Sequence, residues 1–503
     1  MQTIKAELVI IGSGVGGSAI AHQMVGSGAK ILILERGDDL RNEPQNNDAE
    51  AVFIQSRYKT QDEWADLNGE TYRPGQYYYV GGHTKFYGTA MFRFRDTDFR
   101  ETQIDGAVSP AWPIGYEDLA HYYAMAEVLY GVRGTAGIDP TEPPREPFPH
   151  AAIPHEPVIA AVADQFCQQG LTPFPMPSAV DYGPGGKCQR CGTCDAFACR
   201  FDAKGDADTR VMRPLLKHEN VRLERNTEVT HLVTDAAGRR IVKVVARRGG
   251  EVLHVEAPVF VLSAGAINSA LILLRSACEV APNGLANRSG VVGRHLMNHH
   301  LTGLMGVKPF VVNETKFPKT LSLNDFYHGL PDDPDARGNI QMLGNIKGAM
   351  IRSTYPRTPR AAADWLGRHS VDFLAMGEDL PRWDSRVRLS DDGGVQVDYR
   401  PGGADAHDRF VRHVRRVLRR AGFPVVLRHS FGIQAPSHQC GTVRMGDDPT
   451  TSALDGLCRT HDHPNLYVVD GSFFPSSAAL NPALTIAAQA LRVGAHLRQT
   501  LTF

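Results

Sequence analysis

Uninterrupted hydrophobic runs near the two ends of the chain predict strands that are buried on both faces. Leu8–Ile11 and residues 30–34 are the first two runs, and residues 466–469 form a third. Apolar runs of this length are typical of strands in a parallel sheet. Residues 18–27 lie between the first two runs and have a helical pattern, so the N-terminus predicts a strand–helix–strand unit.

An apolar face predicts a helix over residues 482–497. Its members recur at helical spacing: Leu484, Ala487, Ala488, Leu491 and Ala495. Asn481 is a favourable N-cap residue, and Pro482 suits the first helical position. The first turn carries no acidic residue, so we expect its free N–H groups to face a group that becomes negatively charged.

Patterns in the middle of the chain predict antiparallel strands and one surface helix. Residues 339–343 and 395–399 are expected as strands of one antiparallel sheet. Five arginines within residues 412–420 share a helical pattern with valine and leucine. That pattern indicates a solvated amphipathic helix and not a nucleic-acid surface. Residues 77–91 and 138–157 are expected to be covering loops.

Composition narrows the classes of partner. The 503 residues are 42% hydrophobic and 22% charged, with a net charge of −1, as in a globular protein of two or three domains. Near-neutral charge gives no electrostatic case for nucleic acid or an anionic membrane, and neutral small molecules suit it better. No run is long enough for a signal peptide or a membrane span, so we expect a cytoplasmic protein. Its eight cysteines are therefore expected to be reduced.

A glycine pattern directly follows the first predicted strand. It is G-x-G-x-x-G at Gly12, Gly14 and Gly17, and the next strand ends in Glu35. Glycine permits the tight turn, the close approach of the backbone to a pyrophosphate, and the helix–strand packing. Glu35 is suited to accept hydrogen bonds from ribose hydroxyls and would repel a 2′-phosphate. The pattern predicts a site for FAD or NAD and disfavours NADP.

Four cysteines lie within twelve residues, at Cys188, Cys191, Cys194 and Cys199. The first three have ferredoxin spacing, but four residues separate the last two where bacterial ferredoxins have three. Zinc is disfavoured because one crowded loop gives poor tetrahedral geometry. We favour a compact loop of free thiols, and an Fe–S cluster stays open as the alternative.

Histidine positions give no clear metal site. His295 and His299 have the spacing of metal ligands on a helix, but no third ligand follows at a recognisable distance. We therefore expect no metal at this pair. His438 begins the segment 438–446, where a single histidine is by itself more often structural than catalytic.

A family resemblance emerges from segments spread over nearly the whole chain. They are the glycine motif with Glu35 and residues 81–88, 109–114, 261–266, 292–296 and 438–491. Together they resemble the glucose–methanol–choline (GMC) oxidoreductases, FAD enzymes that oxidise alcohols. Within that family, residues 81–88 and the cysteine loop followed by Asp202-Ala203-Lys204 look most like bacterial pyranose oxidases and (C-)glycoside 3-oxidases.

The resemblance implies roles by position. His438 matches the family's catalytic histidine, and Asn481 matches the partner of that histidine. Further positions implied to contact FAD, besides the glycine motif and Glu35, are Gly81, Gly82, His83, Thr84, Val229, Ala264, Gly265, Asp470, Gly471, Pro482 and Thr485. The position at which fungal pyranose oxidases link FAD to histidine falls on another residue type here, which implies non-covalent FAD.

The fold implied by the resemblance is of the α/β class. It combines a Rossmann-like FAD-binding domain with an α+β substrate domain that carries an antiparallel sheet, as in p-hydroxybenzoate hydroxylase-like proteins. The expected FAD-binding domain is discontinuous and comprises residues 1–100, 206–304 and 436–503. Residues 101–205 and 305–435 are expected to form the substrate domain.

The implied activity is oxidation of a secondary hydroxyl, at C3 or C2, of a sugar or glycoside to a ketone. Hydride would pass to flavin N5 with His438 as the base, and O2 or a quinone-type acceptor would take the electrons. The alternative is an Fe–S-containing sugar dehydrogenase that passes electrons to a partner cytochrome, since related dehydrogenases carry a cluster in a similar region. A flavoprotein without activity is disfavoured by the intact pair of His438 and Asn481.

Overall fold

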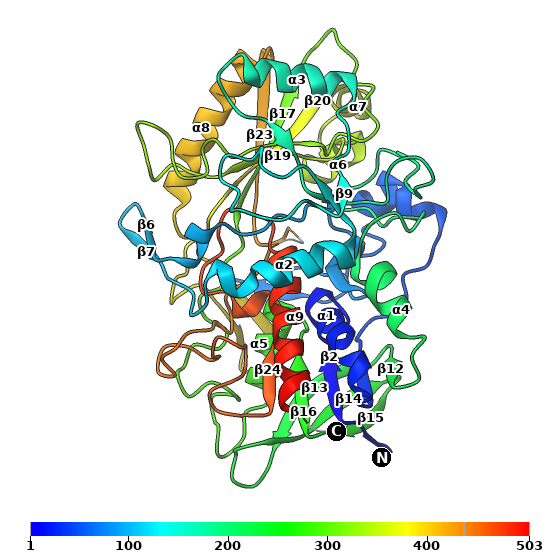
Figure 1. Ribbon diagram of the computed structural model, residues 1–503, viewed down its shortest axis with the longest axis vertical. Helices are drawn as coiled ribbons and strands as arrows, with labels where there is room; N and C mark the ends of the chain where they lie inside the picture. The colour runs from blue at the N-terminus through cyan, green and yellow to red at the C-terminus, as the bar shows by residue number, and fades with distance from the viewer. Residues whose placement is uncertain (1, 436–437, 502–503) are drawn as a thin grey trace.

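A five-stranded parallel sheet forms the core of the lower half of the molecule in Figure 1. The structure is a computed structural model that describes residues 2–435 and 438–501. The strands lie in the order β12 (Val221–Glu224), β3 (Ile31–Leu34), β2 (Leu8–Ile11), β16 (Val259–Leu262) and β24 (Leu466–Val468). Every residue of β2 and β3 is buried, which confirms the strands predicted from the N-terminal hydrophobic runs.

Helices cover this sheet. α1 (Val15–Met24) follows β2 and packs against α9 (Ala483–Thr500), while α2 (Tyr116–Tyr130) packs on α9 (Figure 1). α5 (Ala266–Arg275) follows β16. The predicted C-terminal helix is confirmed, but its start was placed wrongly, because Pro482 is the N-cap residue and is followed by the first helical residue.

A second sheet contributes to the same hydrophobic core. Its order is β1 (Gln2–Lys5), β15 (Glu251–Glu256), β14 (Ile241–Arg248) and β13 (Glu228–Thr234). β1 pairs in parallel with β15, and the other pairs are antiparallel. The alternate buried residues of β14 and β15 pack into the core that includes β2 and β3.

A six-stranded antiparallel sheet occupies the upper half of the molecule (Figure 1). Its order is β10 (Phe174–Pro175), β18 (Leu321–Leu323), β19 (Asn339–Met342), β20 (Ser370–Gly377), β17 (His300–Val307) and β23 (Val425–Phe431). α8 (Ala404–Arg420) and α3 (Pro157–Cys167) cover one face and form a second core with it. α8 confirms the predicted amphipathic helix, with its valines buried against the sheet.

The other predicted antiparallel strand belongs to a different sheet. β22 (Val395–Asp398) lies in a four-stranded sheet with β21 (Arg386–Leu389), β4 (Trp64–Asp66) and β5 (Thr71–Tyr72). The expectation that residues 395–399 share a sheet with β19 was therefore wrong. β22 pairs in parallel with β4, because Trp64, Val387 and Val397 share a small separate core.

The remaining β-strands and α-helices are short. They are β6 (Thr102–Ile104), β7 (Ala107–Ser109), β8 (Val132–Gly134), β9 (His150–Ala151), β11 (Ser178–Ala179), α4 (Arg213–Leu215), α6 (Gly348–Thr354) and α7 (Arg360–Arg368). The division into two domains stays a prediction, and β17 crosses its expected boundary at residue 304.

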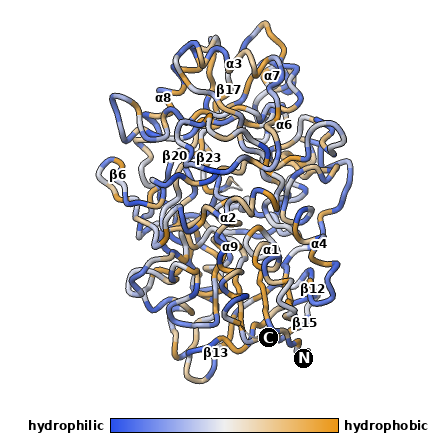
Figure 2. The backbone as a smooth tube through the Cα atoms, in the orientation of Figure 1, coloured by the Kyte–Doolittle hydropathy of each residue, from blue (hydrophilic) through white to orange (hydrophobic). Residues whose placement is uncertain are grey.

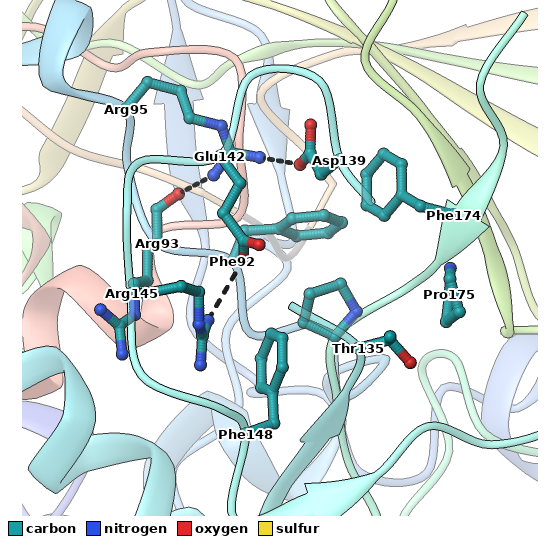
Figure 3. Close-up of a pocket in the computed structure, with 11 residues that line it drawn as sticks. Phe92, Arg93, Arg95, Thr135, Asp139, Glu142, Arg145, Phe148, Phe174 and Pro175 are labelled. Carbon is teal, nitrogen blue, oxygen red and sulfur yellow. Dashed lines mark hydrogen bonds and ion pairs between the residues drawn. The ribbon is translucent and has the colours of Figure 1, made fainter. Parts of the chain in front are cut away.

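Buried ion pairs hold part of the predicted covering loop 138–157 against the body of the protein. Arg145 lies with Nη2 2.7 Å from Glu127 Oε2, and Arg93 makes a second pair of 2.8 Å to the same carboxyl group. Arg95 pairs with Asp139 at the edge of a small pocket shown in Figure 3. These charges have partners, so the loop is anchored and not merely laid over the surface.

Hydropathy follows this architecture. Figure 2 shows hydrophobic segments concentrated along the strands inside the molecule and polar segments on outer loops. Over residues 2–435 and 438–501, no helix combines the length and the hydrophobicity that a membrane crossing needs.

Candidate active site

The glycine motif forms a tight junction between β2 and α1. Gly12 has φ of +103°, and a Cβ there would lie 2.2 Å from the Ser263 carbonyl oxygen. A Cβ at Gly17 would lie 2.1 Å from the carbonyl oxygen of Gly12. Gly14 differs, because a Cβ there would meet no protein atom within 4 Å. Gly12 and Gly17 therefore allow close packing of the backbone, and Gly14 leaves open space beside it.

Glu35 lies at the end of β3 beside this motif. Its carboxylate accepts hydrogen bonds from Ser13 N (3.1 Å), Ser13 Oγ (2.5 Å) and Gly37 N (2.8 Å). Burial raises the pKa of Glu35, and these three hydrogen bonds oppose that shift. A carboxylate has about four lone-pair sites, so capacity remains for a ribose hydroxyl. Val229 follows a segment whose Thr227 N donates to the Glu35 carbonyl oxygen (2.8 Å).

Residues 81–84 pack directly onto the glycine motif. Gly81 N donates to Ser13 Oγ (3.2 Å), so the same serine contacts both this turn and Glu35. Thr84 Oγ1 donates to the carbonyl oxygen of Gly81 (2.6 Å) and fixes the turn. A Cβ at Gly82 would lie 3.1 Å from the Gly14 Cα. The ring of His83 accepts at Nε2 from Tyr77 N (3.4 Å).

The ends of β16 and β24 are joined by Asp470. Its Oδ2 accepts from Gly265 N (3.0 Å) and Ser269 Oγ (2.5 Å), and its Oδ1 accepts from Ser472 N (2.8 Å). Gly265 follows Ala264 and precedes α5, and it again leaves space for a Cβ. Gly471 packs against the backbone, since a Cβ there would lie 2.7 Å from the Gln439 carbonyl oxygen.

This arrangement fits FAD. Gly14 and Gly265 belong to loops at the carboxyl ends of the adjacent strands β2 and β16, and both are open at the Cβ position. Such loops let a pyrophosphate approach the backbone N–H groups at a helix N-terminus. The first turn of α9 has no acidic side chain, and Thr485 Oγ1 there lies 2.8 Å from Tyr123 Oη. Bound FAD would thus meet polar backbone groups at several points.

His438 and Asn481 are brought together although 43 residues separate them. Asn481 Nδ2 lies 3.4 Å from His438 Nε2. The side chain of Asn481 does not cap α9, which corrects the sequence-based expectation. Its Oδ1 instead accepts a hydrogen bond of 2.9 Å from Gln341 Nε2. The amide is therefore engaged in the site and unavailable for capping.

The surroundings of His438 favour the neutral form of its imidazole ring. Burial lowers its pKa well below 6.5, and the nearby His299 and Lys319 lower it further. His438 also has a left-handed backbone, with φ of +68°, which is uncommon for a residue with a side chain. A neutral imidazole with an amide donor beside it is suited to take a proton from an alcohol.

Sequence patterns did not identify two neighbours of this pair. The ring of His299 packs edge-on against His438, with centroids 5.0 Å apart, and burial lowers the pKa of His299 to about 4. His295 lies in a bend and His299 in an irregular segment before β17, so neither is on a helix, and the described residues contain no group of three or more His, Cys, Asp or Glu side chains placed to hold a metal ion. Gln341 was placed on a predicted strand without a role. No local pattern connects either residue to His438.

The four clustered cysteines line one small pocket together with Lys204. All are free thiols, and burial raises the pKa of Cys194 to about 12. The buried Lys204 Nζ donates to the carbonyl oxygens of Tyr87 (2.7 Å), Cys194 (2.6 Å) and Phe197 (2.7 Å). Lys204 thus ties the cysteine loop to the segment that follows residues 81–84. An Fe–S cluster in this loop stays an untested alternative.

Comparisons with known proteins agree with this architecture. Two family models described as GMC oxidoreductase match residues 174–301 and 381–490. Paromamine 6'-oxidase of Streptomyces fradiae is 33% identical over 97% of this chain and 90% of its own length. 6'''-hydroxyparomomycin C oxidase of Streptomyces lividus is also 33% identical, with the same shares covered. The fructose dehydrogenase large subunit of Gluconobacter japonicus is 25% identical over 98% of this chain and 97% of its own.

A solved structure has the same fold. Pyridoxine 4-oxidase from Mesorbium loti superposes with a TM-score of 0.68 at 17% identity and covers 99% of this chain and all of that one. The α/β fold expected from the sequence is confirmed by this likeness together with the family models. The full-length relatives and both family models show that the chain belongs to the GMC oxidoreductase family.

Proposed function

We propose that the protein is an FAD-dependent oxidase or dehydrogenase that converts a secondary hydroxyl, at C3 or C2, of a sugar or glycoside to a ketone. Members of its family are FAD flavoproteins that act on alcohols. The observation that carries the proposal is the His438–Asn481 pair, with 3.4 Å between Nε2 and Nδ2. A neutral imidazole beside an amide donor, close to loops that fit FAD, supports oxidation of an alcohol by a general base.

The two side chains would divide the work on one hydroxyl group. The substrate O–H donates to His438 Nε2, and Asn481 Nδ2 donates to the substrate oxygen. The O–H bond breaks with its proton moving to His438, the C–H bond breaks with its electron pair, and C=O forms. Bound FAD supplies the acceptor for that hydride, and O2 or a quinone-type acceptor then takes the two electrons. General-base catalysis contributes about 10²- to 10⁴-fold to such a step.

The names of the relatives support a sugar-like substrate. Paromamine 6'-oxidase, 6'''-hydroxyparomomycin C oxidase and fructose dehydrogenase are named for carbohydrate-type compounds. The two oxidases are named for a 6' or 6''' position, whereas we propose oxidation at C3 or C2. Paromamine and fructose belong in any substrate panel for that reason.

The sheet above the pair supports a glycoside over a free sugar. Gln341 is aligned across the sheet with Leu374, Gly303 and His429 on successive strands, so these residues share one face. The ring of Phe431 lies near Gly303, where a Cβ would approach it to 3.3 Å. Strand spacing puts His429 about 14 Å from Gln341. Phe431 is 39% exposed, so a hydrophobic substituent can rest on this outer part of the face.

The alternative is an Fe–S dehydrogenase with a cytochrome partner. It is favoured by the four thiols around one pocket and by the likeness to a protein named as a large subunit. A visible spectrum separates the two, because a cluster adds broad absorbance to the flavin bands. The deciding experiment mixes anaerobic holoenzyme with glucose, fructose, paromamine, methyl and phenyl β-glucosides and a C-glucoside. Loss of flavin absorbance followed by ketone analysis supports the proposal, and no reduction by any of them contradicts it.

A further inference from the structure

Gln341 reaches the catalytic pair from the other half of the molecule. It lies on β19, near the centre of the six-stranded sheet, and is 1% exposed. It is aligned with Ser322 on one side and Leu374 on the other, so its backbone is held between two strands. Its Nε2 donates to Asn481 Oδ1 at 2.9 Å, across 140 residues of sequence.

This hydrogen bond and the contact with His438 are consistent with one orientation of the Asn481 amide. An asparagine amide has an acceptor end, Oδ1, and a donor end, Nδ2. Because Gln341 occupies the acceptor end, the donor end is turned toward His438 Nε2. If the amide rotated by half a turn, two acceptors would face the substrate hydroxyl. Asn481 Oδ1 would then compete with His438 for the proton, and nothing would donate to the substrate oxygen.

We propose that Gln341 is a positioning residue that fixes the Asn481 amide with its donor toward the substrate oxygen. The proposal rests on the proposed function of the His438–Asn481 pair. Gln341 does not touch the reacting hydroxyl in this account, and it acts through Asn481. The consequence is that the sheet of one half of the molecule completes the chemistry of the other half.

A change at Gln341 can test which of the two amides donates in the hydrogen bond between Gln341 and Asn481. The ionisable groups that act on His438 are His299 and Lys319, and Lys319 is paired with Asp195 at 3.0 Å. Gln341→Glu keeps the shape of the side chain. When ionised, the new carboxylate can accept hydrogen bonds but cannot donate one. An ionised Glu would accept from Asn481 Nδ2 and so rotate the amide. A protonated Glu would donate to Oδ1 again and restore the native orientation.

The experiment measures anaerobic flavin reduction against pH for three holoenzymes. They are wild type, Gln341→Glu and Gln341→Met, with phenyl β-D-glucoside or the best substrate of the panel. We expect Gln341→Met to reduce flavin about ten- to a hundredfold more slowly at every pH, through lost orientation, with little change in KM. Gln341→Glu should be slow at neutral pH and recover as pH falls through the pKa of the new carboxyl group, which burial raises.

Wild type should show no such gain, because the pKa of His438 is already far below 6.5. Gln396→Met and Gln396→Glu are matched controls on β22, where Gln396 pairs with Asp398 (3.0 Å) away from the site. FAD content should be unchanged in every variant, and the unfolding temperature of Gln341→Glu should fall as pH rises above the pKa of its buried carboxyl group, because the folded state then holds an ionised group away from water. Combining Gln341→Met with Asn481→Ala should cost no more than Asn481→Ala alone, since Gln341 acts through Asn481.

Two results would overturn the positioning role. One is a Gln341→Glu enzyme whose rate does not rise at low pH, and the other is additive loss in the double variant. A wild-type enzyme that no sugar or glycoside reduces would instead refute the proposed function. The two failures are therefore told apart by the wild-type measurement alone. If Gln341→Met fails to fold, the pH profile of Gln341→Glu still decides.

Discussion

Lys319 and Asp195 form an ion pair, with Nζ 3.0 Å from Oδ2, that joins the segment just before β18 to the cysteine loop. Asp195 Oδ2 also accepts from Gly344 N at 2.5 Å, next to the end of β19. The loop that carries the four thiols is thus fastened to the sheet above the active site. The charge of Lys319 also helps to lower the pKa of His438.

That charge should contribute to the acid limit of activity, which is set first by the burial of His438. His438 acts while neutral, so the rate of flavin reduction should fall only when the pH drops through its pKa, which lies well below 6.5. Lys319→Met combined with Asp195→Asn removes both charges without leaving one unpaired. The pKa of His438 should then rise, and activity should be lost at a higher pH as the solution is acidified. If the double variant loses activity at the same pH as wild type, the charge of Lys319 does not affect the pKa of His438.

His438→Ala should slow flavin reduction by sugar about 10²- to 10⁴-fold, because the general base is removed. FAD should remain bound, since the residues that fit FAD lie elsewhere. Anaerobic stopped-flow isolates this step from reoxidation. Asn481→Ala should cost less, because Asn481 accepts no proton. Near-normal reduction in His438→Ala would show that another group is the base.

Gly14→Ala should weaken FAD binding without disturbing the fold. The added methyl group meets no protein atom within 4 Å, so the unfolding temperature of the apoprotein should not change. It would occupy the space that we assign to the pyrophosphate, and the affinity for FAD should fall about tenfold or more, equal to about 1.4 kcal/mol. Gly115→Ala, at another open position, is the matched control. Equal FAD affinity in Gly14→Ala and wild type would show that the pyrophosphate does not bind at this loop.

Acid or heat should release FAD from the purified protein. No histidine stands at the linkage position implied by the family resemblance, and His83 Nε2 already accepts from Tyr77 N. The measurement is flavin absorbance in the supernatant after acid precipitation. Flavin that stays with the precipitate would establish a covalent bond.

Replacing Cys188, Cys191, Cys194 and Cys199 by serine should leave flavin reduction intact. This expectation follows from the assignment of the loop as free thiols held by Lys204. Iron analysis of the purified protein should be close to zero. About three or more irons per chain, with a paramagnetic signal lost in the variant, would favour the cluster-containing dehydrogenase.

Local patterns predicted the first strand, glycine motif and helix of the fold well. β2, the glycine motif and Glu35 are contiguous in sequence, and the physical requirements of each act over a few residues. The strands at 339–343 and 395–399 were also found, but not the sheet of the second. Its partner β4 lies more than 300 residues away, and short strands carry little information about which edge they join.

The candidate site was predictable only where the family resemblance reached. His438 and Asn481 were named from that resemblance, and the structure brings them within 3.4 Å. The capping role expected for Asn481 failed because a tertiary hydrogen bond from Gln341 outcompetes a local one. His299 and Gln341 have no sequence signal, since their importance comes only from contacts across the fold.

Different strands of the six-stranded sheet carry the residue that holds Asn481 and the residues proposed to contact the substrate substituent. Its inner strand β19 holds Asn481 through Gln341, whereas its edge strand β23 carries the exposed Phe431 and the half-buried His429. Edge positions tolerate replacement more readily than inner ones, because one side of the strand is unconstrained. Under the proposed function, specificity for the glycoside substituent would therefore be open to redesign along β23, while Gln341 on β19 would keep the geometry of the His438–Asn481 pair.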